Sequence, residues 1–67
     1  MKKIAKVIRK LDAEGLKAWL EVSQPVAGGR RWEASIMYCD SDGTTVTYGG
    51  EYGATMEVAI ADLDYKL

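Results

Sequence analysis

Residues 43–59 read GTTVTYGGEYGATMEVA and join a β-rich run, three glycines within five positions and the start of a helical pattern. The β-branched run at residues 44–48 predicts a strand. Thr55 is a candidate N-cap for a helix over residues 55–67, whose apolar side chains share one face. The glycines at residues 49–53 predict a loop between the two. This stretch therefore predicts a strand, a turn and a helix in succession.

The predicted loop GGEYG has a candidate function, because glycine-rich loops between a strand and a helix often bind phosphate through backbone N–H groups. Here Glu51 lies in the loop and Glu57 in the first helical turn, with no Lys or Arg beside them. A Walker-type loop would read Gly-Lys-Ser/Thr, whereas this one reads Gly-Ala-Thr. We therefore expect a structural turn, with partner contact through Tyr48, Glu51 and Tyr52 as the alternative.

Two further strands are expected before this stretch. Residues 30–39, RRWEASIMYC, alternate with period two and predict a strand. The sequence Asp-Ser-Asp-Gly at residues 40–43 predicts a hairpin turn, and residues 24–29, with the only proline and a Gly-Gly pair, predict a loop. Residues 16–23 also alternate and favour a strand, although the spacing leaves a helix continuing to about residue 22 as the alternative.

The N-terminal segment KKIAKVIRKL, residues 2–11, has the spacing of an amphipathic helix that Gly15 could end in a left-handed conformation. The order α-β-β-β-α predicts one α+β domain over residues 1–67, a three-stranded antiparallel sheet with both helices on one face. The expected core is Ile4, Val7, Ile8, Leu11, Leu20, Trp32, Ile36, Val46, Ile60 and Leu63.

Composition limits the chemistry that the chain can perform. With 67 residues it would bury only about 60% of its unfolded surface. The single cysteine, Cys39, and the absence of histidine exclude an intrachain disulfide and a zinc site, so no metal or cofactor is expected. General acid–base catalysis at neutral pH most often uses histidine, so no enzyme is expected either. Self-association would compensate for the small core.

The chain is expected to be soluble and cytoplasmic. No segment approaches the ~20 apolar residues of a membrane span, and a lone thiol fits a reducing compartment. The net charge is −1, but the two halves of the chain differ in charge. Residues 1–33 carry eight Lys/Arg and four Asp/Glu, whereas residues 34–67 carry one Lys and six Asp/Glu. If the hairpin and the final helix lie together, their acids form a negative end that steers the protein toward a partner with a basic surface.

The second half of the chain, from Trp32 to Leu67, resembles the double-stranded-RNA-binding domain. The resemblance lies in WEASIMYC, the turn DSDG, TTVTYGG, EYG and the helix ATMEVAIADL. In that family the start of the last helix carries lysines that grip phosphates, whereas residues 54–59 here hold no lysine and one glutamate. The resemblance therefore implies the topology and not the RNA contacts. The stretch Gly-Ala-Thr-Met-Glu at residues 53–57, where the last helix is expected to start, also resembles a strand-loop-helix segment of antitoxins of HicB type.

We expect a non-enzymatic interaction module that binds and blocks a protein or ribonucleoprotein partner, of the type encoded by phages and other mobile elements, anti-CRISPR proteins among them. The expected contact residues are Trp19, Met37, Tyr48, Glu51, Tyr52, Glu57 and Tyr65. Trp19 and Met37 would lie on the outer sheet face, which could also form a homo-oligomer. Tyr65 belongs to a second apolar stripe of the final helix, expected to pack against the first helix.

Two alternatives remain open at this point. One is a nucleic-acid-binding domain of the double-stranded-RNA-binding shape, which would use the basic face of the first helix: Lys2, Lys3, Lys6, Arg9 and Lys10. The other is a HicB-like antitoxin or regulator. Salt-dependent binding to nucleic acid would distinguish the first alternative from a protein-binding module.

Overall fold

The computed structural model describes residues 1–26 and 28–67 and has the predicted order of elements. The elements are α1 (Lys2–Ala13), β1 (Lys17–Ser23), β2 (Trp32–Cys39), β3 (Thr45–Gly53) and α2 (Met56–Lys66). The three strands form one antiparallel sheet in the order β1-β2-β3. The expected α+β fold is therefore confirmed. The loop expected at residues 24–29 lies between β1 and β2, and residue 27 of it falls outside the described residues.

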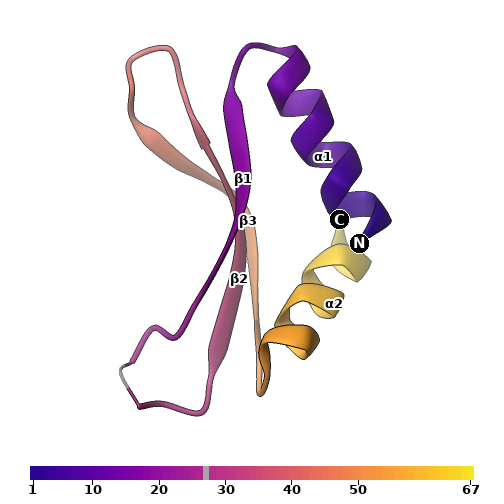
Figure 1. Ribbon diagram of the computed structural model, residues 1–67, viewed down its shortest axis with the longest axis vertical. Coiled ribbons are helices and arrows are strands. Elements are labelled where there is room, and N and C mark those ends of the chain that lie inside the picture. Colours follow the sequence, from indigo (N-terminus) through magenta and orange to yellow (C-terminus); the bar gives the residue numbers. More distant parts are fainter. Residues whose placement is uncertain (27) are drawn as a thin grey trace.

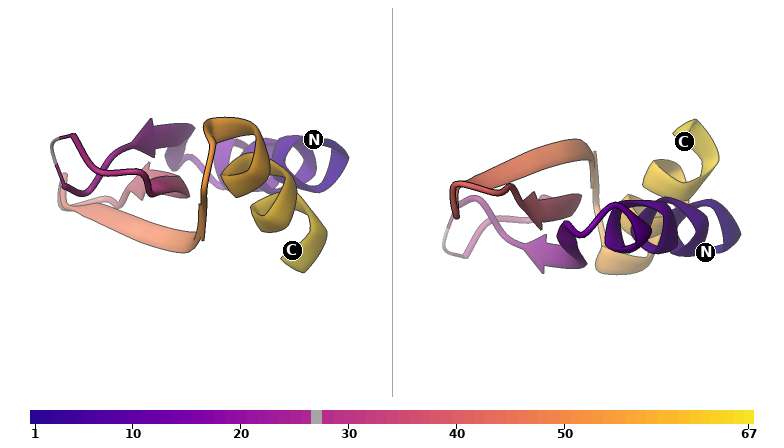
Figure 2. Two further views of the ribbon diagram at one scale, coloured as in Figure 1. Left: turned by 90° about the horizontal axis from the view of Figure 1, so that it is seen from below. Right: turned by 90° about the horizontal axis from the view of Figure 1, so that it is seen from above.

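Both helices lie on one face of the sheet, and no element covers the other face within the described residues (Figures 1 and 2). The molecule measures 35 × 25 × 12 Å. Its accessible surface of 4671 Å² exceeds the roughly 4,200 Å² that a monomer of 7.4 kDa has on average. The fold is thus a flat, two-layered unit with more exposed surface than its mass requires.

The two helices meet end to end rather than side by side (Figure 1). The carboxylate of Asp64, in the last turn of α2, accepts a hydrogen bond of 2.8 Å from the Ile4 amide in the first turn of α1. In return the Lys3 ammonium donates a 3.2 Å hydrogen bond to the Tyr65 carbonyl. Each helix therefore satisfies a free backbone group of the other, with the charge that the helix dipole favours at each end.

Helix α1 ends where the sequence predicts. Gly15 has φ +83°, and its amide donates to the Asp12 carbonyl while the Leu16 amide donates to the Leu11 carbonyl. These two bonds form a Schellman motif, which glycine favours because it has no Cβ to clash. The Asp12 carboxylate also accepts from the Ala18 amide at 3.0 Å and holds the start of β1. Residues 17–23 are consequently a strand and not a continuation of the helix.

The core lies between the sheet and the two helices. Its buried apolar residues are Ile4, Leu11, Ala34, Ile36, Ala59 and Leu63. Four of the ten expected core residues are therefore confirmed as buried, and the other six, Val7, Ile8, Leu20, Trp32, Val46 and Ile60, are only partly buried. A two-layered domain of this size cannot enclose all of its apolar side chains.

Strand β3 extends further than the sequence predicts, because residues 49–53 belong to it. Gly49 pairs with Ile36, and the pairing continues as far as Gly53 opposite Trp32. The expected loop is therefore wrong: GGEYG is a paired strand, and residues 54 and 55 make the turn into α2. Partner contact through Tyr48, Glu51 and Tyr52 stays a prediction, but these residues belong to a strand and not to a loop.

A β-bulge at Tyr48 separates the two halves of β3. Residues 36 and 37 of β2 pair with residues 49 and 47 of β3, so Tyr48 is an extra residue in the strand. One extra residue moves each later side chain of the strand to the opposite face of the sheet. Val46 and Glu51 consequently lie on the same, helix-covered face, although they are five positions apart.

Gly53 lets the last part of β3 pass directly beneath α2. A Cβ atom at this position would lie 2.5 Å from the Ala59 nitrogen and 2.9 Å from the Ala59 Cα. Both are backbone atoms, which cannot turn aside as a flexible side chain can. The glycine therefore serves close packing between strand and helix and not a turn.

Helix α2 begins as predicted, because the Thr55 hydroxyl accepts a hydrogen bond of 3.1 Å from the Val58 amide. Its second apolar stripe does not pack against α1, which corrects the expectation. Val58 is 45% exposed and Tyr65 is 80% exposed, and Ala61 is exposed as well. Because the helices meet only at their ends, α1 does not cover the side of α2.

Candidate interaction surfaces

The uncovered face of the sheet carries a row of three side chains, one from each strand. Trp19 of β1 lies opposite Met37 of β2, and Met37 lies opposite Thr47 of β3. The Thr47 hydroxyl is 3.3 Å from the Met37 sulfur. Cross-strand neighbours of this kind shield one another, and Trp19 and Met37 are half-buried without any helix above them. The structure thus places these two predicted contact residues side by side.

Two small residues lie next to each other in the middle of this face. Ser35 is only 7% exposed and lies opposite Gly50, where a Cβ atom would be 3.0 Å from the Ser35 hydroxyl oxygen. Farther along the same face Tyr52 lies opposite Glu33, and the Arg31 guanidinium stacks 4.2 Å from the Tyr52 ring centroid. The uncovered face therefore has aromatic residues towards both ends, and between them lie Ser35, Gly50 and the exposed Glu21.

The basic face of α1 borders a groove of about 290 Å³. The groove is lined by Lys3, Lys6, Val7, Lys10, Tyr48 and Leu67. Tyr48, the bulged residue of β3, is 50% exposed here. The structure thus brings three of the five predicted basic residues together with one of the predicted contact residues. Lys2 and Arg9 are exposed on α1 but do not line this groove.

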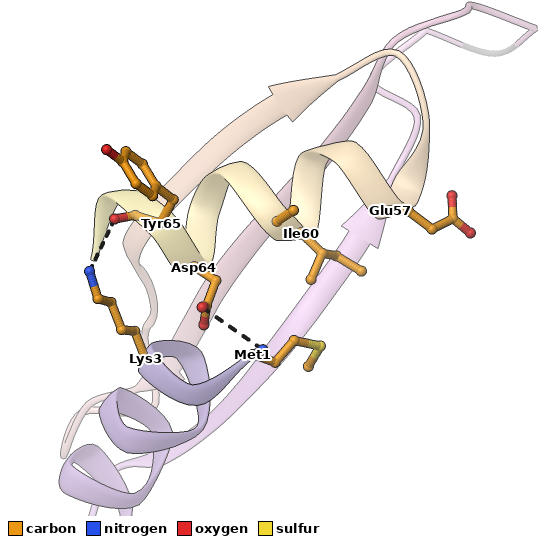
Figure 3. Close-up of a pocket in the computed structure, with 7 residues that line it drawn as sticks. Met1, Lys3, Glu57, Ile60, Asp64 and Tyr65 are labelled. Carbon is orange, nitrogen blue, oxygen red and sulfur yellow. Dashed lines mark hydrogen bonds and ion pairs between the residues drawn. The ribbon is translucent and has the colours of Figure 1, made fainter.

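A wider groove of about 580 Å³ lies where α1 meets α2 (Figure 3). Glu57, Ile60 and Tyr65 of α2 line it together with Lys3 and Asp64, among others. The side chains of Lys3 and Asp64 already take part in the reciprocal helix caps. Lys3 also lies 5.8 Å from the Tyr65 ring centroid. Two of the charged side chains of this groove, Lys3 and Asp64, therefore hold the two helices together.

Glu51 does not face outward as a contact residue would. It lies on the helix-covered face, where the Lys66 ammonium is 2.9 Å from its carboxylate. The hydrogen bond from Lys66 lowers the pKa of Glu51, and the same bond raises the pKa of Lys66. This ion pair connects the end of α2 to β3. In the part of the chain that the structure describes, no group of three or more Cys, Asp or Glu residues is arranged to hold a metal ion.

The acidic residues do not gather into one negative end. The hairpin with Asp40 and Asp42 and the start of α2 with Glu57 lie at opposite ends of the sheet (Figure 1). The Asp40 carboxylate accepts hydrogen bonds from the amides of residues 42 and 44 and so shapes its own turn. Glu51 and Asp64 are engaged with Lys66 and with α1. The condition for steering toward a basic partner surface is therefore not met.

Comparisons with protein-family models, with curated proteins and with solved structures find no match for this chain. Within residues 1–26 and 28–67, neither helix is long and apolar enough to cross a membrane. Among the described residues, three surfaces bring expected contact residues together. Trp19 and Met37 meet on the uncovered sheet face, Tyr48 meets three lysines in the basic groove, and Glu57 and Tyr65 line the groove where α1 meets α2.

Proposed function

We propose that the protein is a non-enzymatic interaction module that binds a protein partner through the uncovered face of its sheet. The observation that supports this most directly is the pairing of Trp19 with Met37 on the face of the sheet opposite the two helices. Tryptophan, tyrosine, methionine and arginine are enriched in the cores of protein interfaces. Trp19, Met37, Tyr52 and Arg31 supply all four residue types.

The size of this face favours a different protein over a second copy. Three strands of about eight residues cover roughly 15 × 26 Å, or about 400 Å² of flat surface. A standard interface buries about 800 Å² on each partner. Two copies joined face to face would therefore form a weak dimer, whereas a larger partner can also contact the edges of the sheet.

The mode of action that fits a small module with one such face is occupation of its partner's surface. Small inhibitors encoded by phages, anti-CRISPR proteins among them, act in this way, and we place the protein in that class. Its energy of binding would come mainly from Trp19, because tryptophan is enriched among the few residues that contribute most of the affinity of an interface.

Site-directed photo-crosslinking tests the proposal. A photoreactive amino acid replaces Glu21, which is exposed on β1 and shares the uncovered face with Trp19. The matched control carries the same group at Asp62, which is exposed on α2. In extract of the native cells we expect one protein adduct from position 21, no such adduct from position 62, and loss of the adduct when Trp19→Ser is added.

Three results would overturn the proposal. Equal adducts from positions 21 and 62 would show that the uncovered face has no special role. An adduct of twice 7.4 kDa would assign the face to a second copy of the chain. A nuclease-sensitive adduct would assign it to nucleic acid. Circular dichroism of the Trp19→Ser variant establishes that the loss of the adduct does not come from unfolding.

A further inference from the structure

The basic groove between α1 and β3 has a composition that the protein-binding face does not explain. Lys3, Lys6 and Lys10 follow one another along one side of α1 and span about 10 Å of the helix. All three line the groove, and no Asp or Glu is among the described residues that line it with them. Among the described residues, Lys6 and Lys10 have no ion-pair partner. The groove therefore presents positive charge that the fold itself does not neutralise.

Tyr48 adds an aromatic surface to these charges. The bulge makes it the extra residue of β3, so its side chain serves neither the core nor the row of Trp19 and Met37. Half of it is exposed, beside the lysines. Bulges often redirect a side chain toward a binding site. A cationic groove with an aromatic side chain is the arrangement that proteins use to bind single-stranded nucleic acids.

We propose that this groove binds a single-stranded nucleic acid, with phosphates on Lys6 and Lys10 and a base stacked on Tyr48. Lysine binds phosphate as a compact point charge, without the bidentate geometry that an arginine fork offers to phosphate and carboxylate alike. A duplex keeps its bases stacked inside and would leave Tyr48 without a stacking partner. The net charge of −1 does not oppose this, because surface charges beyond about 10 Å are largely screened at 0.1 M salt.

Fluorescence anisotropy with a labelled oligo(dT) or oligo(U) of about 16 nucleotides measures the binding. Two phosphate contacts, on Lys6 and Lys10, predict a slope of log K against log salt of about −1.4 for a single strand. In the double variant Lys6→Gln/Lys10→Gln the slope should fall to near zero and the affinity at low salt by about tenfold. Tyr48→Ala should weaken binding about 5- to 100-fold, because one stacking contact is lost. Lys3 is left intact, because it caps α2.

The matched control is Lys17→Gln, which removes an exposed lysine outside the groove and should leave binding unchanged. Trp19→Ser should also leave it unchanged, so failure here is distinguishable from failure of the protein-binding proposal. Four results would each overturn the proposal. Lys17→Gln could weaken binding as much as the groove variants do, or a duplex of the same length could bind more tightly. Anionic vesicles or an acidic peptide could bind equally well, or the oligonucleotide could fail to bind at low salt.

Discussion

Replacing Gly53 with alanine tests the most constrained contact of the fold. The added Cβ would lie 2.5 Å from the Ala59 nitrogen, so α2 would have to move as a body. Overpacking of this kind costs about 1–3 kcal/mol. Since both neighbours are backbone atoms, we expect a loss of about 2–3 kcal/mol, which in a domain of this size lowers the melting temperature by about 10 °C or more.

Gly49→Ala is the matched control for this change. Gly49 lies on the same face of the same strand, its φ is not positive, and the nearest atom to a new Cβ is the Leu67 Cδ2 at 4.0 Å. Alanine there should be neutral or stabilising by up to about 1 kcal/mol, because it restricts the unfolded chain. Thermal and urea unfolding followed by circular dichroism measure both variants. Equal losses, or a Gly53→Ala variant as stable as the parent, would refute the packing of residues 49–53 beneath α2.

Three other substitutions test the remaining contacts. Leu63→Ala leaves a cavity beneath α2 and should lower the free energy of unfolding by about 2–5 kcal/mol; an unchanged urea midpoint would contradict its place in the core. Asp64→Ala removes the cap on α1 and should lower the free energy of unfolding by about 0.5–2 kcal/mol. The control Asp62→Ala changes an exposed neighbour and should leave that free energy within about 0.5 kcal/mol of the parent's. Equal effects of the two variants would show that the cap contributes nothing. Lys66 lowers the pKa of Glu51, so the stability from this pair is present above the ordinary carboxyl pKa of 4.5 and is lost as the pH falls through the lowered value. Lys66→Met should flatten the dependence of stability on pH in that acidic range, and a profile identical to the parent's would rule out a contribution from the pair.

The sequence predicts those parts of the fold whose signals are local. Gly15 and the alternation after it place the end of α1 and the whole of β1, because a helix stop and a strand period are each contained in a few residues. The Thr55 cap is of the same kind. The assignment of Trp19 and Met37 to the outer face also needs only the alternation along each strand.

The features that the sequence does not reveal depend on contacts between distant segments. The bulge at Tyr48 interrupts the period of two in β3, and Gly53 is small because α2 passes over it. Glycine weakens a strand by itself, so residues 49–53 resemble a loop until their pairing with β2 is known. The basic groove likewise requires Tyr48 to meet Lys10 across the fold.

The cap of α1 by Asp64 has a consequence for how the chain is synthesised. The Ile4 amide and the Asp64 carboxylate are 60 residues apart, so at about 5–20 residues per second the cap arrives about 3–12 s after the helix that needs it. An isolated helix of 12 residues is marginal in water. Helix α1 is synthesised before α2, so it obtains this cap only after α2 has followed it out of the ribosome.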